Sequence, residues 1–284
     1  MDYQTPTNAE DAARLLSQEG AQVLAGGTDL LVKLRSGMTR PAAIVDIKHV
    51  PDLRGISHDA KGWRIGAATS CAQIGEHAEL AVAWPGVVEA LQLIGSTQIQ
   101  GRATLGGNLC NASPAADSVP ALIAAGAVCE VVGVNGKREV PVEKIVTGPG
   151  TNSLARGEFV LGFRLPDPPK RSGDAYLRLI PRSEMDIAVV GAAVALELDA
   201  KGTCTRARVA LGAVAPTPLL VEDAAKALVG TRVDDAALDK LAAAASAACK
   251  PIDDKRGTVA YRVKVAGVLA KRAARIACER AGAK

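Results

Sequence analysis

Two glycine-containing segments are the most informative chemical feature of this sequence. Residues 101–120 read GRATLGGNLCNASPAADSVP, with three glycines, two asparagines and two prolines around a single cysteine. A shorter segment, VLAGGTDLLVKLRSG, occupies residues 23–37. Glycine lets backbone N–H groups converge on a ligand without interference from Cβ atoms, and a following helix adds its partial positive charge. Two such segments, roughly eighty residues apart, suit a pyrophosphate held from both sides, with hydroxyl donors from Thr28 and Thr104 and an amide from Asn108.

The two segments differ in how specific they are. Neither is a Walker motif, because no Lys-Ser/Thr pair follows the glycines, and neither matches the dinucleotide fingerprint GxGxxG. The AGG sequence alone is weak evidence for a ligand site, since many strand–helix turns contain glycine for steric reasons. The order of polar groups over residues 101–117 is harder to explain as a simple turn. Cys110 within it has no cysteine nearby in sequence to form a disulfide, so we expect a small packed residue and not a redox thiol.

Composition limits the remaining functional classes. With 284 residues, 48% of them apolar, the chain can bury a substantial core. Aromatic residues make up only 2%, which argues against the base-stacking platforms of single-stranded nucleic-acid binding. No apolar run reaches transmembrane length and no secretion signal is apparent, so we expect a cytoplasmic protein without a membrane span. The six cysteines form no CxxC pair and the histidines have no metal-like spacing, so we expect reduced thiols and no metal site.

Charge is unevenly distributed along the chain. Residues 250–284 contain ten Lys/Arg and three Asp/Glu, while the rest is slightly acidic. A basic helix there could contact phosphate or an acidic partner, or could be a solvated face.

The first fifty residues predict a βαβ-like unit. Thr7 and Glu10 have capping-box spacing for a helix that ends at Gly20. A strand at 21–25, a helix from Thr28 or Asp29 to Gly37 and a buried strand at 42–47 follow.

The rest of the chain predicts an α+β protein. In the middle region we expect a helix capped by Thr69 or Ser70, a helix opened by Pro85 and a helix capped by Asp117 or Ser118. Strands are predicted at 62–70, 127–132, 138–142 and 158–166. The proline-rich stretch PDPPKRSG at 166–173 is the clearest boundary. Beyond it, strands at 174–180, 186–198 and 204–214 precede helices at 221–230, 236–248 and 258–280.

The motifs AGGTDLL, VDI, RIGAATS, QIQGRATLGGNLCNASPAAD and RSEMDIAVVGAAVAL occur in this order. In this the chain resembles, over essentially its whole length, the FAD-binding medium subunit of molybdenum hydroxylases of the carbon monoxide dehydrogenase and xanthine dehydrogenase type. The resemblance implies a PCMH-type FAD-binding domain at residues 1–168, made of two α/β subdomains (about 1–55 and 56–168). A C-terminal domain with a three-stranded antiparallel sheet and helices would occupy 172–284.

The resemblance also implies roles for individual residues. The glycine segment at 23–37 would wrap the FAD pyrophosphate, and the segment at 101–120 would close over it. Asp117 would accept a hydrogen bond from the adenosine end of the cofactor. Ile94 and Val160 would form apolar walls, and Arg178 would lie near the flavin. The complete set of expected FAD-binding residues is Ala25, Gly26, Gly27, Thr28, Asp29, Leu30, Ile94, Thr104, Leu105, Gly106, Gly107, Asn108, Asp117, Val160 and Arg178.

The implied function is electron transfer without a catalytic side chain. A large molybdenum-cofactor subunit would oxidise the substrate, a small [2Fe–2S] subunit would relay electrons, and FAD in this chain would pass them to an external acceptor. The implied assembly is a heterotrimer or a dimer of heterotrimers. No cysteine cluster suggests the iron–sulfur insertion that some relatives carry in this subunit. Two alternatives are a self-sufficient PCMH-type flavin oxidoreductase and a non-catalytic module that has lost the flavin and binds phosphate or a partner.

Overall fold

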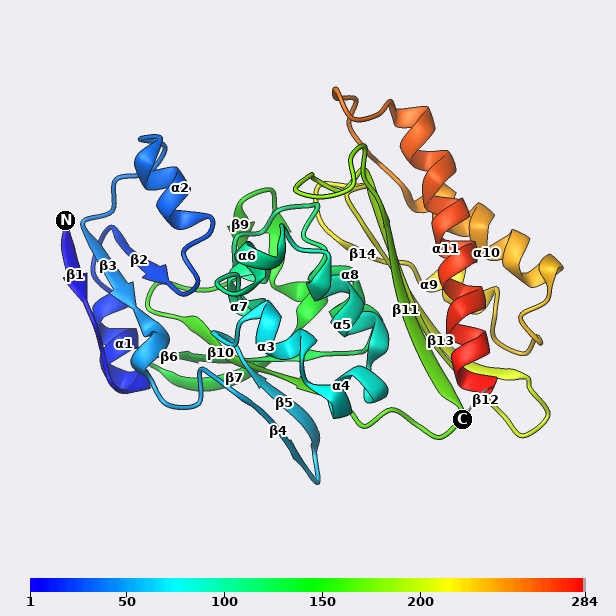
Figure 1. Ribbon diagram of the computed structural model, residues 1–284, viewed down its shortest axis with the longest axis horizontal. Helices are drawn as coiled ribbons and strands as arrows, with labels where there is room; N and C mark the ends of the chain where they lie inside the picture. Colours follow the sequence, from blue (N-terminus) through cyan, green and yellow to red (C-terminus); the bar gives the residue numbers. More distant parts are fainter. Residues whose placement is uncertain (283–284) are drawn as a thin grey trace.

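The protein consists of three blocks arranged along its long axis, as the computed structural model shows (Figure 1). The structure describes residues 1–282. A small N-terminal block lies at one end, a middle block carries a five-stranded sheet, and a C-terminal block carries a second large sheet covered by helices (Figure 1). The α+β class predicted from the sequence is confirmed.

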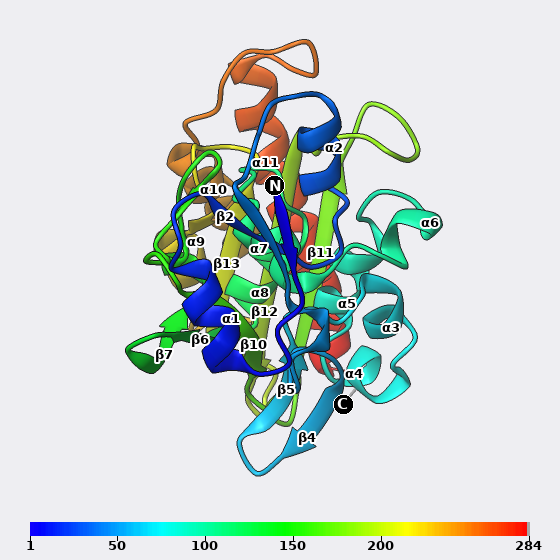
Figure 2. The same cartoon turned by 90° about the vertical axis from the view of Figure 1, so that its left-hand side faces the viewer.

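The N-terminal block is a three-stranded parallel sheet in the order β1-β3-β2, and its end of the molecule faces the viewer in Figure 2. Its helix α1 begins after Asn8, whose side chain accepts a hydrogen bond from the Asp11 amide at 2.7 Å. The capping box predicted for Thr7 and Glu10 is therefore wrong, because the polar residue one position later takes the cap. The elements are β1 Asp2–Gln4, α1 Ala9–Leu16, β2 Ala21–Leu24, α2 Leu30–Arg35, β3 Ala43–Asp46 and the 3₁₀ turn Ile47–His49.

The middle block is an antiparallel sheet in the order β4-β5-β10-β6-β7 with short helices packed on it. Ser70 caps α3 in a full capping box with Gln73, and Pro85 opens α5, as predicted. Its strands are β4 Ile56–Asp59, β5 Gly62–Gly66, β6 Val128–Gly133, β7 Gly136–Pro141, β8 Val146–Gly148, β9 Thr151–Asn152 and β10 Phe159–Leu165. Its helices are α3 Cys71–Gly75, α4 Ala78–Ala83, α5 Pro85–Gln92, α6 Thr97–Gln100, α7 Leu105–Cys110, α8 Ser118–Ala124 and the 3₁₀ turn Val142–Lys144.

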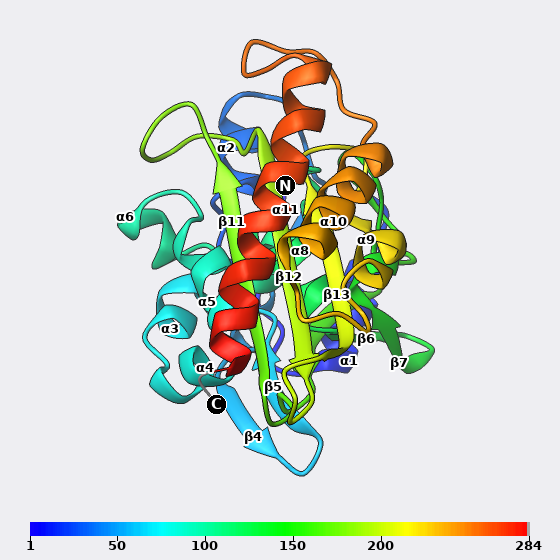
Figure 3. The same ribbon diagram turned by 90° about the vertical axis from the view of Figure 1, so that its right-hand side faces the viewer.

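The C-terminal block is an antiparallel sheet in the order β11-β12-β13-β14. The three predicted strands are present, and a fourth of two residues pairs at the edge beyond Pro216 and Pro218. Helices α10 and α11 cover one face of this sheet (Figure 3), and α5 and α8 of the middle block pack on the other. The elements are β11 Ser172–Leu179, β12 Val190–Leu198, β13 Cys204–Gly212, β14 Leu219–Leu220, α9 Glu222–Lys226, α10 Asp235–Ala248 and α11 Val259–Gly282.

Two hydrophobic cores follow this arrangement. One runs through the N-terminal and middle blocks, and Tyr176, Ala193 and Ala210 of the C-terminal sheet belong to it. The other fills the space between the same sheet and helices α9 to α11. The C-terminal sheet thus contributes side chains to both cores, so the middle and C-terminal blocks share a continuous apolar contact.

Much of the basic charge near the C-terminus is paired within the chain. Lys271 and Arg275 of α11 form ion pairs with Asp239 and Asp235, and Arg280 pairs with Glu89 of the middle block. This pairing favours the interpretation of a solvated, self-paired helix face. No helix among residues 1–282 is both long and apolar enough to span a membrane.

Candidate functional site

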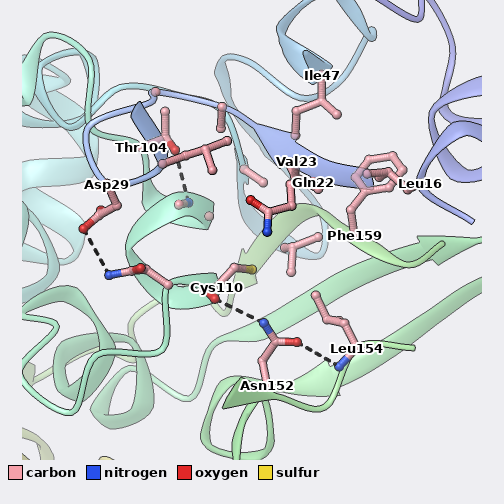
Figure 4. A pocket seen from close by; sticks show the side chains of 18 of the residues that line it. Leu16, Gln22, Val23, Asp29, Ile47, Thr104, Cys110, Asn152, Leu154 and Phe159 are labelled. Carbon is pink, nitrogen blue, oxygen red and sulfur yellow. Dashed lines mark hydrogen bonds between the residues drawn. The ribbon is translucent and has the colours of Figure 1, made fainter. Parts of the chain in front are cut away.

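A pocket of about 640 Å³ lies between the N-terminal and middle blocks, and both glycine segments line it (Figure 4). This volume is typical of sites for organic ligands. The expected FAD-binding residues that line it are Ala25, Gly26, Gly27, Thr28, Asp29, Leu30, Ile94, Thr104, Gly106, Gly107, Asn108 and Val160. Three others, Leu105, Asp117 and Arg178, are absent from the lining.

The two glycine segments touch through their backbones. A Cβ atom on Gly26 would lie 1.9 Å from the carbonyl oxygen of Arg102 in the second segment. A Cβ on Gly106 would lie 2.8 Å from the oxygen of Ala67, which follows β5, so the second segment also needs bare backbone to pack on the middle block. Gly27 has a φ of +83°, in the left-handed region that favours glycine. Bare backbone is therefore needed to bring the two segments together.

The segments differ in the N–H groups they offer. No residue in the described chain accepts a hydrogen bond from the amides of Gly27, Thr28 and Asp29. In the second segment, the Gly106 amide donates to the Ala67 oxygen at 2.8 Å and the Gly107 amide donates to the Thr104 hydroxyl at 3.1 Å. The first segment thus has unpaired donors on residues that line the pocket, whereas these second-segment amides are already bonded within the protein. This asymmetry was not apparent from the sequence.

Asn108 is oriented by a residue that sequence reasoning missed. Its Oδ1 accepts a hydrogen bond from the buried Ser118 hydroxyl at 2.6 Å. This leaves the Nδ2 group of Asn108 as a donor on a pocket-lining side chain. Ser118 was predicted only as a possible helix cap.

Asp117 lies at the contact between the middle and C-terminal blocks. Its Oδ1 accepts from the Tyr176 hydroxyl and its Oδ2 from Arg178, both at 2.7 Å. The predicted capping role is wrong, because the residue has helical dihedrals and its side chain bonds to Tyr176 and Arg178 of the C-terminal block instead. Burial raises the pKa of the Asp117 carboxyl, and the Arg178 charge and the Tyr176 hydrogen bond oppose that rise. The Nε atom of Arg178 is buried and has no hydrogen-bond partner within the described residues.

The far half of the pocket is lined by residues that were not singled out in the sequence, some of them on elements that were predicted. Figure 4 shows apolar side chains from Leu16, Ile47, Leu154 and Phe159, with the amides of Gln22 and Asn152. The signals that could have found this half were the GPGTN sequence that ends at Asn152 and the buried strand that begins at Phe159.

Cys110 also lines the pocket. Burial raises the pKa of its thiol to about 12, so it is not a thiolate at neutral pH. The six cysteines are all free, and residues 1–282 contain no group of three or more His, Cys, Asp or Glu side chains able to hold a metal ion.

Residues 1–168 match the sequence model of the FAD binding domain in molybdopterin dehydrogenase. The chain belongs to this family. Residues 175–277 of this FAD-binding family member match a second model, the CO dehydrogenase flavoprotein C-terminal domain. The resemblance recognised from the sequence motifs is thus confirmed.

Known proteins of this type are similar to this chain over nearly its whole length. The carbon monoxide dehydrogenase medium chain of Afipia carboxidovorans is 37% identical over 99% of this chain and 97% of its own. The xanthine dehydrogenase FAD-binding subunit of Escherichia coli O157:H7 is 32% identical over 99% and 97%. A crystal structure of Cu,Mo-CO dehydrogenase in its cyanide-inactivated form superposes with a TM-score of 0.94 at 36% identity, covering 99% of this chain and 98% of the matched chain.

Proposed function

We propose that this chain is the FAD-carrying electron-transfer subunit of a molybdenum-containing hydroxylase, and that the pocket between its N-terminal and middle blocks holds the FAD. Electrons would arrive from a [2Fe–2S] subunit and leave to an external acceptor. The observation that carries this proposal is the meeting of both glycine segments at one pocket, with the Gly27, Thr28 and Asp29 amides unpaired there.

The residues present fit an FAD. The three unpaired amides suit the phosphate oxygens, and the Thr28 hydroxyl and Asn108 Nδ2 add further donors. The apolar side chains of Leu16, Ile47 and Phe159 would exclude water from the far half of the pocket. When bound, FAD supplies the one- and two-electron chemistry, and the protein contributes binding, orientation and electrostatics.

Asp117 and Arg178 have a different place in this proposal. Both Asp117 oxygens are already bonded to side chains, so a ribose hydroxyl would share this carboxylate with Tyr176 and Arg178. The buried positive charge of Arg178 would lie near the flavin, and the Nε group of Arg178 has no hydrogen-bond partner within the described residues.

The assembly and location belong to the proposal as well. The relatives named above are described as a medium chain and a subunit, which supports a component of a larger enzyme over a self-sufficient oxidoreductase. We propose a large molybdenum-cofactor subunit and a small [2Fe–2S] subunit as partners, in a heterotrimer or a dimer of heterotrimers, in the cytoplasm. We also propose residues 1–168 and 172–284 as the two domains, with subdomains at about 1–55 and 56–168; the last two residues of the second domain lie outside the described part.

The proposal is tested by the visible absorption spectrum of the purified chain, alone and co-expressed with its partner subunits. We expect flavin bands equivalent to about one releasable FAD per chain, because one pocket is lined by both glycine segments. The Gly26→Ala variant should lose them, because its Cβ would lie 1.9 Å from the Arg102 oxygen. Gly101→Ala is the matched control, since a Cβ there meets only the Gln98 oxygen at 3.6 Å.

Circular dichroism of both variants separates loss of FAD from loss of fold. A colourless wild-type protein that remains colourless with partners and added FAD would reject the proposal in favour of a module without flavin. Bands that appear only with the partners would mean that assembly completes the site.

A further inference from the structure

Helix α2 carries the first glycine segment into the pocket, yet little of the helix is held by packing. None of its six residues is buried, and Leu31 and Val32 are 41% and 58% exposed. A short helix is marginal unless tertiary contacts hold it. The position of α2, and with it the unpaired amides of Gly27, Thr28 and Asp29, must therefore depend on specific contacts.

One side chain of the middle block supplies such contacts from the other side of the pocket. The Nδ2 group of Asn111 donates to Asp29 Oδ1 at 3.1 Å, and its Oδ1 accepts from Lys33 Nζ at 2.7 Å. Figure 4 shows the Asp29 carboxylate turned toward this bond. All three residues line the pocket. Asn111 thus uses both ends of its amide to bond Asp29, the N-cap residue of α2, and Lys33 within the helix.

We propose that Asn111 is a positioning residue of the cofactor pocket, which fixes α2 so that the first glycine segment faces the second and bound FAD is retained. This inference rests on the proposed function, because it names what holds one wall of the same site. Asn111 acts through Asp29 and Lys33, and it was not among the expected FAD-binding residues.

The first test needs no cofactor. Amide hydrogen exchange in the apo protein reports on α2 through the amides of Leu31 and Lys33, which donate to the Gly27 and Asp29 oxygens at 3.1 and 3.0 Å. Exchange there should accelerate about tenfold in Asn111→Ala, because both side-chain hydrogen bonds that hold the helix are lost. Asn152→Ala is the control: Asn152 lines the same pocket but bonds Cys110 and Leu154 of the middle block, so exchange in α2 should not change.

The second test uses a paired exchange of side chains and the rate of FAD release, followed by flavin fluorescence. Asn111→Asp keeps the bond from Lys33 but places a carboxylate against Asp29, so FAD should leave about tenfold faster. In the double variant Asp29→Asn/Asn111→Asp, the donor and acceptor are exchanged and the bridge can form again. Release from the double variant should therefore be slower than from Asn111→Asp alone, with Asp29→Asn measured as the reference.

The outcomes separate this inference from the proposed function. Unchanged exchange in α2 of Asn111→Ala, or a double variant that releases FAD as fast as Asn111→Asp, would overturn the bridge. A wild-type protein that never binds FAD would reject the proposed function, while the exchange experiment would still decide whether Asn111 positions α2.

Discussion

Individual polar residues hold the pocket walls in place, and Asp46 at the end of β3 is the clearest titratable case. Its carboxylate accepts hydrogen bonds from the Tyr3 hydroxyl and from Lys48 Nζ, both at 2.5 Å. Burial acts to raise the pKa of Asp46, but the hydrogen bonds from Lys48 and Tyr3 outweigh it and hold the pKa below its ordinary value. Asp46 therefore contributes stability above its unfolded pKa, and this contribution is lost as the pH falls through the lower folded value.

The corresponding prediction concerns acid unfolding. Asp46→Asn should be less stable than wild type at neutral pH. The difference should shrink as the pH falls below about 4, the ordinary aspartate pKa at which the unfolded chain takes up its proton, and continue to shrink toward the lower pKa of folded Asp46. Urea unfolding of both proteins between neutral and acidic pH measures this. A stability difference that stays constant with pH would show that Asp46 acts by packing and not by charge.

Ser118 gives a second prediction at the scale of the residue. Ser118→Ala removes the donor that orients Asn108, so FAD should bind several-fold more weakly, in line with a hydrogen bond worth ~1 kcal/mol. Fluorescence titration of the apo protein with FAD measures the change. Ser113→Ala is the control, because the Ser113 hydroxyl bonds only the Ala115 amide. Equal FAD affinity of wild type and Ser118→Ala would mean that Asn108 does not contact the cofactor.

At the scale of the element, the sequence predicted long, periodic or well-capped segments and missed short exposed ones. Strands β5, β10 and β12 were predicted from their apolar runs, and the start of α3 from its cap at Thr69 or Ser70, of which the structure has Ser70. Strands β1 and β4 were missed, because they are short and mostly exposed and so carry no apolar pattern. Asp117 was misassigned as a cap because its partners, Tyr176 and Arg178, lie about sixty residues away in sequence.

The same limit applies to the pocket. The two glycine segments could be identified because their local pattern is dense, whereas the far wall comes from single residues such as Leu16 and Phe159 on separate elements. Only the folded chain brings these residues together.

Helix α11 illustrates how one residue can join several elements. Arg262 is 3% exposed and donates to the Val189 oxygen at 2.7 Å and to Asp254 Oδ1 at 2.7 Å. It also reaches the Ala213 oxygen at 3.2 Å. It thus links α11 with the start of β12, the end of β13 and the loop before the helix.

We expect Arg262→Met to lower the free energy of unfolding by about 3 kcal/mol, because it leaves buried carbonyls and the Asp254 carboxylate without their donor. Arg272→Met on the same helix is the control, since Arg272 is exposed and should change stability by less than about 0.5 kcal/mol. Denaturant unfolding of both variants measures the difference. Similar stabilities of the two variants would mean that solvent replaces the Arg262 hydrogen bonds.

At the scale of the whole molecule, the C-terminal sheet is joined to the FAD-binding region by polar contacts as well as by the shared core. Arg208 of β13 donates to the Ile123 oxygen at 2.9 Å and to Glu143 at 3.2 Å, and the Ala213 amide donates to the Pro114 oxygen at 2.7 Å. The bonds of Asp117 to Tyr176 and Arg178 and the Arg280–Glu89 ion pair also join the middle and C-terminal blocks. We infer that the two blocks unfold together and not as independent units.

Tyr176→Phe tests this coupling at its most buried point. The substitution removes the hydroxyl that donates to Asp117, so the free energy of unfolding should fall by about 1–3 kcal/mol while the transition stays single. The pKa of Asp117, already raised by burial, should rise further without that donor. A raised carboxyl pKa favours folding below the unfolded pKa and loses this effect as the pH rises through the folded one, so the deficit of Tyr176→Phe should be larger at neutral than at acidic pH. Tyr261→Phe, at a position that is 46% exposed, provides the control. If Tyr176→Phe instead separates the unfolding curve into two transitions, the polar contact and not the shared core couples the two blocks.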